Sequence, residues 1–411
     1  MRRFQITFTP EYDNTASNPI TTNIDLKYQD TTLFKDPSGN PTTGLDANDD
    51  GPYLTFKGFP QLPSATYTGN GFGQAGPGGT RVTNDNEGLV IAPDGTYWIS
   101  DEYGPYIWHF NKNGKMIGAI EPPLAYVPMR NGSISFSADS PTFYSGLADD
   151  VNPTDPDTGR DNNHGFEGLT ISNDGQYLYA LLQAATVQDG GTSGSKEGYT
   201  RMVQYDITTA GEPELVAEYV VHLPTYITAA GKNHIAAQSE IHYIDGEQFL
   251  VLARDSNGGR GQANSTSVYR HADVFDISTA TNIVGRYDAA NSAVAPNGVL
   301  AANITAATYC QWLDYNVNSQ LNRFYLHNGG PQDNGLLNEK WESLALVPVN
   351  PDNGGSDGEF FLLSMSDNDF ITQNGHLNGG AFNYSDASGF NLDSQFLAFR
   401  VTLPAGADPS T

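Results

Sequence analysis

The chain is poor in cysteine and in positive charge. Cys310 is the one cysteine among 411 residues, so no disulfide bond can form within the chain. Only 20 lysines and arginines stand against 47 aspartates and glutamates, which gives a formal net charge of −27. Because proteins that bind the nucleic-acid backbone need clustered lysine and arginine, this balance argues against nucleic acid and anionic membranes as partners. The acidity serves either solubility or the binding of hard cations, which prefer carboxylate oxygens.

Long apolar runs and several familiar catalytic motifs are also missing. No stretch approaches the roughly 20 apolar residues of a membrane-spanning helix, and the first residues lack the roughly 7–15 apolar residues of a secretory signal peptide. The sequence has no Gly-x-Ser-x-Gly elbow, no His-Glu-x-x-His pair, no phosphate-binding P-loop and no Cys/His zinc spacing. A serine hydrolase on an α/β-hydrolase fold is therefore disfavoured.

What the chain does contain is a pattern that occurs four times. A glutamate opens a short β-type run, a turn follows, and an aromatic or aliphatic run ends in a polar cluster. The four glutamates are Glu87, Glu167, Glu240 and Glu342. Because Asp-Gly-type turn signals lie between β-rich runs in three copies, and a longer turn in the fourth, each copy predicts a β-hairpin.

The spacing of these hairpins predicts an all-β propeller. Successive glutamates are 80, 73 and 102 residues apart, which fits one four-stranded blade plus loops. The further strands expected in these blades are residues 106–110, 115–120, 201–206, 215–221, 272–277 and 282–287. We expect about six or seven four-stranded blades in a single domain of residues 1–403, followed by a tail of residues 404–411. Residues 1–83 form an incomplete first unit, whose strands at 4–8 and 24–28 are candidates to complete one blade with residues 396–401.

The topology of a hairpin places each glutamate beside the cluster that ends its partner strand, because the start of one antiparallel strand lies next to the end of the other. The candidate catalytic residues at this common rim are Glu87, Asp101, Glu102, Glu167, Glu240, Arg254, Asp255 and Glu342. Crowded carboxylates repel unless a cation or a shared proton offsets their charge. Alternatively, each glutamate accepts backbone N–H bonds from the neighbouring blade and links the blades together.

Arg254 is the natural receiver of an anion, since a guanidinium pairs bidentately with phosphate or carboxylate. The alternative is an ion pair with Asp255 or a neighbouring glutamate. Arg201 and Arg260 are further candidates to hold a phosphate oxygen.

A calcium-loop pattern begins at Asp46. Asp46, Asn48 and Asp50 alternate and Gly51 follows, as in the first half of an EF-hand loop. Lys57 stands where the loop's last carboxylate belongs, so the segment is either a different Ca²⁺ site or a polar surface turn. The candidate metal ligands are Asp46, Asn48, Asp50, Asp367 and Asp369.

Several longer strings resemble one known family. They occupy residues 86–89, 100–106, 165–170, 238–241, 252–255 and 366–370. Together these strings resemble the phytase-like family, described as having an esterase-like activity of phytase, and are most similar to its fungal members. The resemblance implies a β-propeller, a phosphoesterase activity and an extracellular location. It also implies that this chain lacks the usual N-terminal segment, which carries a signal peptide and an opening hairpin.

These observations predict a hydrolase of phosphoric esters that depends on a divalent cation, with Ca²⁺ the expected ion and the site at the axial mouth of the propeller. We expect a small-molecule ester substrate, no nucleic-acid or membrane partner, and a monomer. Two alternatives stay open: a carboxylic-ester or lactone hydrolase on the same scaffold, and a noncatalytic binding propeller.

Overall fold

The computed structural model describes residues 1–20, 23–49, 51, 53–71, 74–140, 151–192, 194–209, 212–377 and 380–403. Within these ranges the chain is all-β, with one short α-helix, α1 (Asn318–Leu321). Four single-turn 3₁₀ helices accompany it: Val187–Asp189, Pro296–Gly298, Asn322–Phe324 and Pro351–Asn353. In the described part of the chain, no helix has the length and apolar character needed to cross a bilayer.

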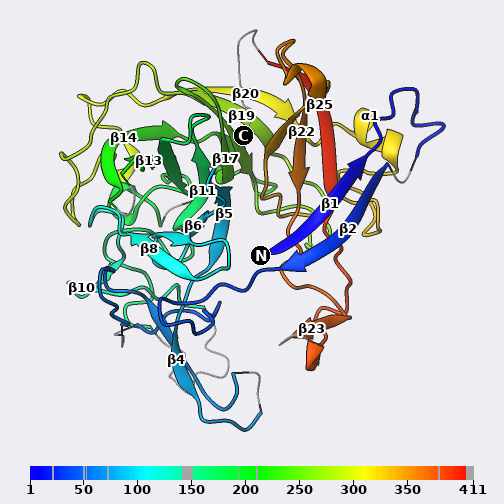
Figure 1. The fold of residues 1–411 in the computed structure, drawn as a ribbon. Coiled ribbons are helices and arrows are strands. Elements are labelled where there is room, and N and C mark those ends of the chain that lie inside the picture. Colours follow the sequence, from blue (N-terminus) through cyan, green and yellow to red (C-terminus); the bar gives the residue numbers. More distant parts are fainter. Residues whose placement is uncertain are drawn as a thin grey trace.

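The strands form four antiparallel blades arranged around a common axis (Figure 1). Blade 1 consists of β5 (Asn86–Ile91), β6 (Tyr97–Asp101), β7 (Ile107–Phe110) and β8 (Met116–Ile120). Blade 2 consists of β11 (Phe166–Ile171), β12 (Tyr177–Leu182), β13 (Tyr199–Asp206) and β14 (Glu214–His222). Blade 3 consists of β17 (Ala237–Asp245), β18 (Gln248–Arg254), β19 (Arg270–Asp276) and β20 (Thr308–Asp314). Blade 4 has three strands, β21 (Ala345–Pro348), β22 (Glu359–Met365) and β25 (Phe396–Thr402).

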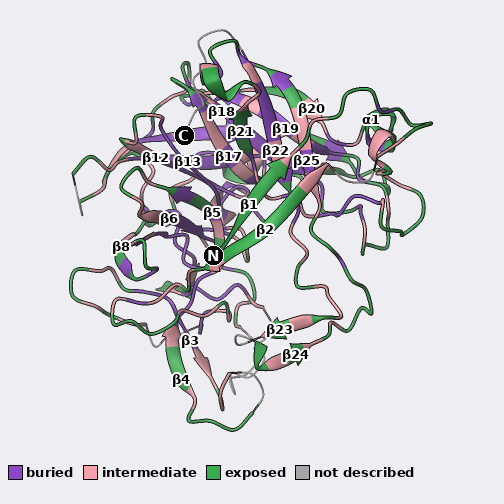
Figure 2. Cartoon of the chain, turned by 45° about the vertical axis from the view of Figure 1, so that its right-hand side comes forward, coloured by how far each residue is buried: buried purple, intermediate pink, exposed green. Residues whose placement is uncertain are grey.

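The remaining strands pair into two-stranded hairpins outside the blades. They are β1 (Arg2–Phe8) with β2 (Ile24–Thr31), β3 (Ser64–Tyr67) with β4 (Gly79–Val82), β9 (Met129–Arg130) with β10 (Ser133–Ile134), β15 (Thr225–Ile227) with β16 (Asn233–Ile235), and β23 (Gly375–Leu377) with β24 (Phe382–Tyr384). The hairpin of β1 and β2 is largely exposed, in contrast to the buried strands of the blades (Figure 2).

The turns of the predicted hairpins are built by their own polar side chains. In blade 1, the Asp94 carboxylate accepts hydrogen bonds from the backbone N–H and the hydroxyl of Thr96, at 2.9 and 2.7 Å. In blade 2, the Ser172 hydroxyl accepts from the backbone N–H of Tyr177 at 2.9 Å. Such local bonds fix the register of each hairpin, which is why the turn signals in the sequence were sufficient to place it.

The first strands of blades 1, 2 and 3 lie side by side, with β11 against both β5 and β17. Two glycines allow this approach, each directly after a rim glutamate. A Cβ on Gly88 would lie 2.6 Å from Cβ of Leu169, and one on Gly168 would lie 2.8 Å from the backbone nitrogen of Ile241. The Glu-Gly pairs of the sequence therefore have a packing reason, since any side chain there would force neighbouring blades apart.

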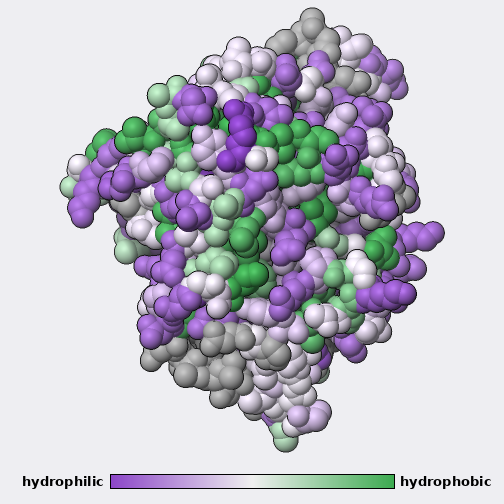
Figure 3. Space-filling model, turned by 90° about the vertical axis from the view of Figure 1, so that its left-hand side faces the viewer, coloured by the Kyte–Doolittle hydropathy of each residue, from purple (hydrophilic) through white to green (hydrophobic). Residues whose placement is uncertain are grey.

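Apolar side chains fill the space between successive blades. Phe249 and Phe275 of blade 3 stack at 5.0 Å in a cluster shared with blade 2. Trp341 is fully buried between blades 3 and 4, against Leu252 and Leu362. On the face drawn in Figure 3, polar side chains predominate and apolar side chains form separate patches. The core thus consists of inter-blade layers, as expected when one sheet packs face to face against the next.

The structure corrects part of the expected architecture. Four blades are found in the described residues, and the expected six or seven are not confirmed. β25 joins the last blade as predicted, but β1 and β2 pair only with each other, and Phe8 merely packs edge-on against Phe361. The strand predicted at 282–287 is wrong: the backbone of Ile283 instead bonds to Glu218 of β14, and β20 takes the outer place in blade 3. Residues 404–411 lie outside the described ranges.

Candidate active site at the mouth of the propeller

The rim where β5, β11 and β17 begin and their partner strands end is called the mouth. Register places Asn86 opposite Asp101, Phe166 opposite Leu182 and Ala237 opposite Arg254. The structure brings Glu102, Glu167 and Glu342 close enough to Glu87 at this rim for their charges to act on it. Burial raises the pKa of Glu87, and the charges of these three other glutamates raise it further.

A compact carboxylate group forms the centre of the mouth. One carboxylate oxygen from each of Asp85, Glu87 and Glu102 lies within 4.8 Å of the other two. Glu102 is buried, whereas Asp85 and Glu87 are half-buried. Within the described ranges, no hydrogen bond reaches the carboxylates of Asp85 and Glu87. Burial raises the pKa of Asp85 to about 6. We call Asp85, Glu87 and Glu102 the carboxylate triad.

Glu167 lies beside the carboxylate triad and shares a hydrogen-bond donor with it. The Gln183 side-chain amide donates to Oε1 of Glu102 at 3.1 Å and also to Oε1 of Glu167. The other oxygen of Glu167, Oε2, is buried and has no partner among the described residues. Burial, followed by the charge of Glu342, raises the pKa of Glu167 to about 8. This carboxyl therefore holds a proton at neutral pH unless another positive charge approaches it.

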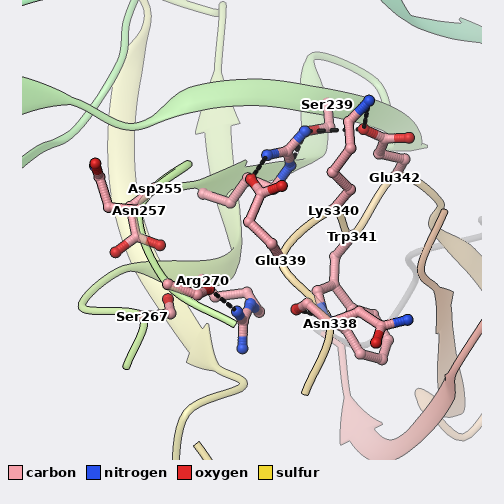
Figure 4. Close-up of polar contacts among 12 residues, drawn as sticks. Ser239, Asp255, Asn257, Ser267, Arg270, Asn338, Glu339, Lys340, Trp341 and Glu342 are labelled. Carbon is pink, nitrogen blue, oxygen red and sulfur yellow. Dashed lines mark hydrogen bonds and ion pairs between the residues drawn. The ribbon is translucent and has the colours of Figure 1, made fainter. Parts of the chain in front are cut away.

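Arg254 is held by glutamates. Its guanidinium bonds Glu339 at 2.5 Å, Glu342 at 2.8 Å and the Ser239 hydroxyl at 3.0 Å. Figure 4 labels Ser239, Glu339 and Glu342, the three residues whose side chains bond the Arg254 guanidinium. The ion pair with neighbouring glutamates, one of the two alternatives in the sequence, is thus the arrangement present, and Asp255 is not part of it. Since two carboxylates already balance Arg254, it offers little charge to a bound anion.

Lys340 is the more accessible cation of the mouth. Its ammonium lies 3.3 Å from Glu342 and 3.0 Å from Asp369, and 32% of its side chain is exposed. Glu342 and Asp369 hold the pKa of Lys340 above its usual range despite burial, which by itself would lower it. The charge of Lys340 in turn opposes the raised pKa values of Asp85, Glu102 and Glu167. A fixed, partly exposed positive charge therefore faces the carboxylates.

Other predicted site residues lie near the mouth but have structural partners. Oε1 of Glu240 accepts backbone N–H bonds from Leu169 of blade 2 at 3.1 Å and from Ile241 at 2.8 Å, so this glutamate links two blades. Asp101 accepts from the backbone of Asp85 at 2.7 Å and of Gly104 at 3.0 Å, which fixes the position of Asp85. These two carboxylates support the site rather than face it.

Asp255 and the two other arginines are likewise engaged elsewhere. Oδ2 of Asp255 accepts the backbone N–H of Val268 at 2.6 Å, in the connection between β18 and β19. Arg201 is fully buried against Asp189 at 2.9 Å, so it cannot reach a substrate. Arg260 donates to the Asn334 side chain at 2.7 Å and to the backbone carbonyl of Asn391 at 3.0 Å.

The loop with the calcium-like pattern has its oxygens occupied. Asp46 accepts from the Ser137 hydroxyl at 2.9 Å and from two backbone N–H groups, and Asn48 pairs with Thr66. Asp50 lies outside the described residues. Asp367 accepts from the backbone of the two residues that follow it. The geometry thus favours the carboxylate triad, rather than this loop, as the place for a cation.

Sequence reasoning missed three members of the mouth: Asp85, Lys340 and Gln183. The sequence does contain a signal for Asp85 and Lys340, namely their spacing from two of the rim glutamates. Asp85 stands two residues before Glu87 and Lys340 two residues before Glu342. Because side chains on an extended chain repeat their direction every second residue, each pair shares one face. Gln183, directly after β12, has no comparable signal.

Comparison with known proteins adds a family. A protein-family model described as phytase-like, with an esterase-like activity of phytase, matches residues 6–370, a span that includes every residue of the mouth named above. A protein of Arthroderma benhamiae, described as an uncharacterized secreted protein, is 49% identical over 387 residues, which cover 91% of this chain and 75% of that protein. Among solved structures, Kuenenia stuttgartiensis hydrazine synthase aligns with a TM-score of 0.27 and 10% identity, over 78% of this chain and 64% of that chain, less than two thirds of its length. A likeness that weak carries no argument.

Proposed function

This chain belongs to the phytase-like family, and we propose that it hydrolyses phosphoric esters at the mouth with the help of a bound divalent cation. The family description indicates a hydrolase of the phosphoesterase-like class. The observation that carries the location of the site is the carboxylate triad, three carboxylates whose oxygens lie within 4.8 Å of one another. The 49% identical relative is described as secreted, which supports an extracellular location for this chain as well.

The donor set fits a hard cation. All the oxygens come from carboxylates, the ligands that Ca²⁺ and Mg²⁺ prefer. The carboxylates of Asp85 and Glu87 accept no hydrogen bond from described protein groups, and the buried Oε2 of Glu167 has no described partner. We propose Asp85, Glu87 and Glu102 as ligands, with Glu167 beside them, and Ca²⁺ as the ion. When bound, such an ion supplies a Lewis acid for the phosphoryl oxygen and lowers the pKa of a bound water.

The surrounding residues have complementary tasks. A phosphate ester approaching a protein of net charge −27 needs a local positive charge, and Lys340 provides one at the edge of the carboxylate triad. Glu342 contacts both Lys340 and Arg254, so Arg254 acts as a positioning residue that fixes Glu342 and, through it, the ammonium. Gln183 orients Glu102 and Glu167 toward each other.

The test is turnover of p-nitrophenyl phosphate and of phytate with Ca²⁺, with Mg²⁺ and after chelation. We expect cation-dependent hydrolysis that Glu87→Gln reduces about 100-fold or more in kcat/KM, the scale of losing one major electrostatic contribution. The matched control is Glu247→Gln, an exposed glutamate in the turn between β17 and β18, at the opposite rim. Turnover that survives chelation, or equal loss in both variants, would end the proposal.

The same assays separate the alternatives. A carboxylic-ester or lactone hydrolase would turn over p-nitrophenyl acetate or a lactone and leave the phosphates untouched. A noncatalytic propeller would turn over none of them. The bonds made by Glu240 favour a structural role for that one glutamate, whereas Glu87 makes no such bonds to described groups. Blade linking alone therefore does not account for the carboxylates of the mouth.

A further inference from the structure

Positive charge is scarce at the mouth. Every lysine and arginine of the chain lies in the described ranges. The cations whose charges act most strongly on the mouth carboxylates are Lys340 and Arg254. Arg160, whose pKa the charge of Glu102 raises, is fully buried and bonds the backbone carbonyl of Tyr103. The positive charge available to a ligand therefore comes from two side chains.

Both of these cations are already balanced by acids. Arg254 bonds Glu339 and Glu342. Lys340 contacts Glu342 and Asp369, and Figure 4 shows the first of these contacts. The carboxylate triad adds further acidic groups beside them, and even a bound Ca²⁺ leaves the acids in the majority. Because like charges oppose binding, a ligand with many phosphates is disfavoured, whereas a lone phosphate can be met by Lys340.

An exposed aromatic side chain stands beside Lys340. Phe370 is 74% exposed, the most of any large apolar residue in the described part of the chain. It follows directly on Asp369, whose carboxylate lies 3.0 Å from the Lys340 ammonium, and consecutive Cα atoms are about 3.8 Å apart. The two segments are also joined through their backbones, because the N–H of Asp367 donates to the carbonyl of Lys340 at 2.8 Å. Phe370 therefore borders the cation at which a phosphate would arrive.

Phe370 holds a backbone conformation that large side chains disfavour. Its φ is 55° and that of Asp369 is 49°, both in the left-handed region. Local bonds fix this turn: the Asn368 side chain accepts the N–H of Phe370 at 3.1 Å, and the Asn368 carbonyl accepts the N–H of Ile371 at 2.8 Å. Neither the exposed ring nor the left-handed backbone stabilises the fold. Residues held in such conformations gather at ligand-binding sites, which points to a ligand contact for Phe370.

We propose that the substrate is a phosphoric monoester of an apolar, aromatic alcohol, and that Phe370 is the specificity-determining contact for its organic part. This inference rests on the proposed phosphoesterase function and narrows its substrate class. Lys340 meets the phosphate, and the aromatic body packs against the Phe370 ring. Hydrolysis breaks the P–O bond to the alcohol, and water supplies an oxygen to the phosphate and a proton to the alcohol. Phytate, which carries a phosphate on every ring carbon, suits neither the charge nor the aromatic contact.

The test compares benzyl phosphate, glycerol 2-phosphate and phytate as substrates of the full chain. Free Ca²⁺ is held constant with a metal buffer, because phytate chelates calcium. Benzyl phosphate and glycerol 2-phosphate both release an aliphatic hydroxyl, so they differ mainly in the organic part. We expect kcat/KM for benzyl phosphate to exceed that for glycerol 2-phosphate about tenfold and that for phytate about 100-fold or more. Equal use of benzyl phosphate and phytate overturns the proposal.

Three variants locate the contact. Phe370→Ala should lower kcat/KM for benzyl phosphate about tenfold and leave glycerol 2-phosphate unchanged, which also shows that the variant is folded. The matched control is Ile91→Ala, an exposed apolar residue at the end of β5 opposite the mouth, which should change neither. Asp369→Asn removes a negative charge beside Lys340 and tolerates the left-handed backbone, so it should improve phytate severalfold relative to benzyl phosphate. No loss in Phe370→Ala, or an equal loss on both monoesters, contradicts the proposal.

A binding measurement separates this inference from the proposed function. Benzylphosphonate has a P–C bond and is not hydrolysed, so calorimetric titration with Ca²⁺ present reports recognition without turnover. Saturable binding that Phe370→Ala weakens about tenfold supports the substrate class even where no ester is turned over, and the proposed function alone then fails. Turnover of phytate or glycerol 2-phosphate in preference to benzyl phosphate leaves the proposed function standing and overturns the substrate class, as does absent binding of benzylphosphonate.

Discussion

Replacement of Glu167 by glutamine tests the electrostatics of the mouth directly. A protonated glutamate and a glutamine have nearly the same shape, so Glu167→Gln mimics the form that burial favours. The Gln183 amide can still donate to Oε1, and the new amide N–H₂ takes the place of the unpaired Oε2. The variant therefore removes a titrating proton and a candidate cation contact without opening a cavity.

The sign of the effect follows from the raised pKa. In the folded chain the pKa of Glu167 is about 8, against an ordinary value of 4.5, so the folded state keeps a proton that the unfolded chain releases between these values. The stability that the protonated Glu167 side chain contributes is fully present below pH 4.5 and is lost as pH rises through 8. At pH 7 this difference between the folded and unfolded pKa values lowers the free energy of unfolding by about 3 kcal/mol, at about 1.4 kcal/mol per pH unit. Glu167→Gln should recover that amount, about 3 °C in unfolding temperature for 411 residues.

The assay is thermal unfolding at pH 4.5, 7 and 8, with chelator and with Ca²⁺. Chelated wild type should be less stable than the variant at pH 7 and 8 and equal to it near pH 4.5. Ca²⁺ at about 100 times its Kd should stabilise the wild type by about 2.7 kcal/mol and the variant much less. A variant that is less stable at every pH, or that keeps the full Ca²⁺ shift, would refute the reasoning.

Three other substitutions probe separate parts of the rim. Glu240→Leu removes the acceptor of two backbone N–H groups and should cost about 2–4 kcal/mol in urea unfolding, whereas Glu240→Gln keeps the acceptor and should stay close to wild type. Arg254→Met leaves the carboxylates of Glu339 and Glu342 without this counterion and should cost about 3–5 kcal/mol in urea unfolding at pH 7; a loss below about 1 kcal/mol would contradict this. Lys340→Met should raise KM for p-nitrophenyl phosphate about tenfold or more in steady-state kinetics, with a smaller effect on a neutral ester, because the ammonium attracts the anionic group.

The sequence predicts the blades where the signal is local. Asp94 and Ser172 close their turns with bonds to residues two and five positions away, so the hairpins they belong to can be placed without knowing the rest of the fold. Outer strands have no such marker. Residues 282–287 are as rich in β-favouring residues as Thr308–Asp314, yet only the second segment pairs with β19. That choice depends on how a long connection packs against β14, which is tertiary information.

The common rim that carries the candidate site could be predicted from the sequence, but the contacts of each residue in it could not. Antiparallel pairing brings the rim glutamates to one end of the axis, and this follows from topology alone. The individual role of each glutamate does not follow, because it depends on the neighbouring backbone. Glu240 finds the free N–H of Leu169 across the blade junction, whereas Glu87, at the matching position of its own hairpin, has no such partner among the described residues.

This difference between equivalent glutamates points to function. A link between blades needs only an acceptor oxygen, which an amide supplies as well as a carboxylate does. Asp85, Glu87, Glu102 and Glu167 instead crowd ionisable oxygens where burial and mutual repulsion raise their pKa values, and this arrangement lowers the stability of the metal-free fold at neutral pH. Uncharged side chains would remove that penalty without loss of packing. Perturbed carboxyls such as those of Asp85 and Glu87, which accept no hydrogen bond from described groups, are typical of sites that bind a cation or transfer a proton.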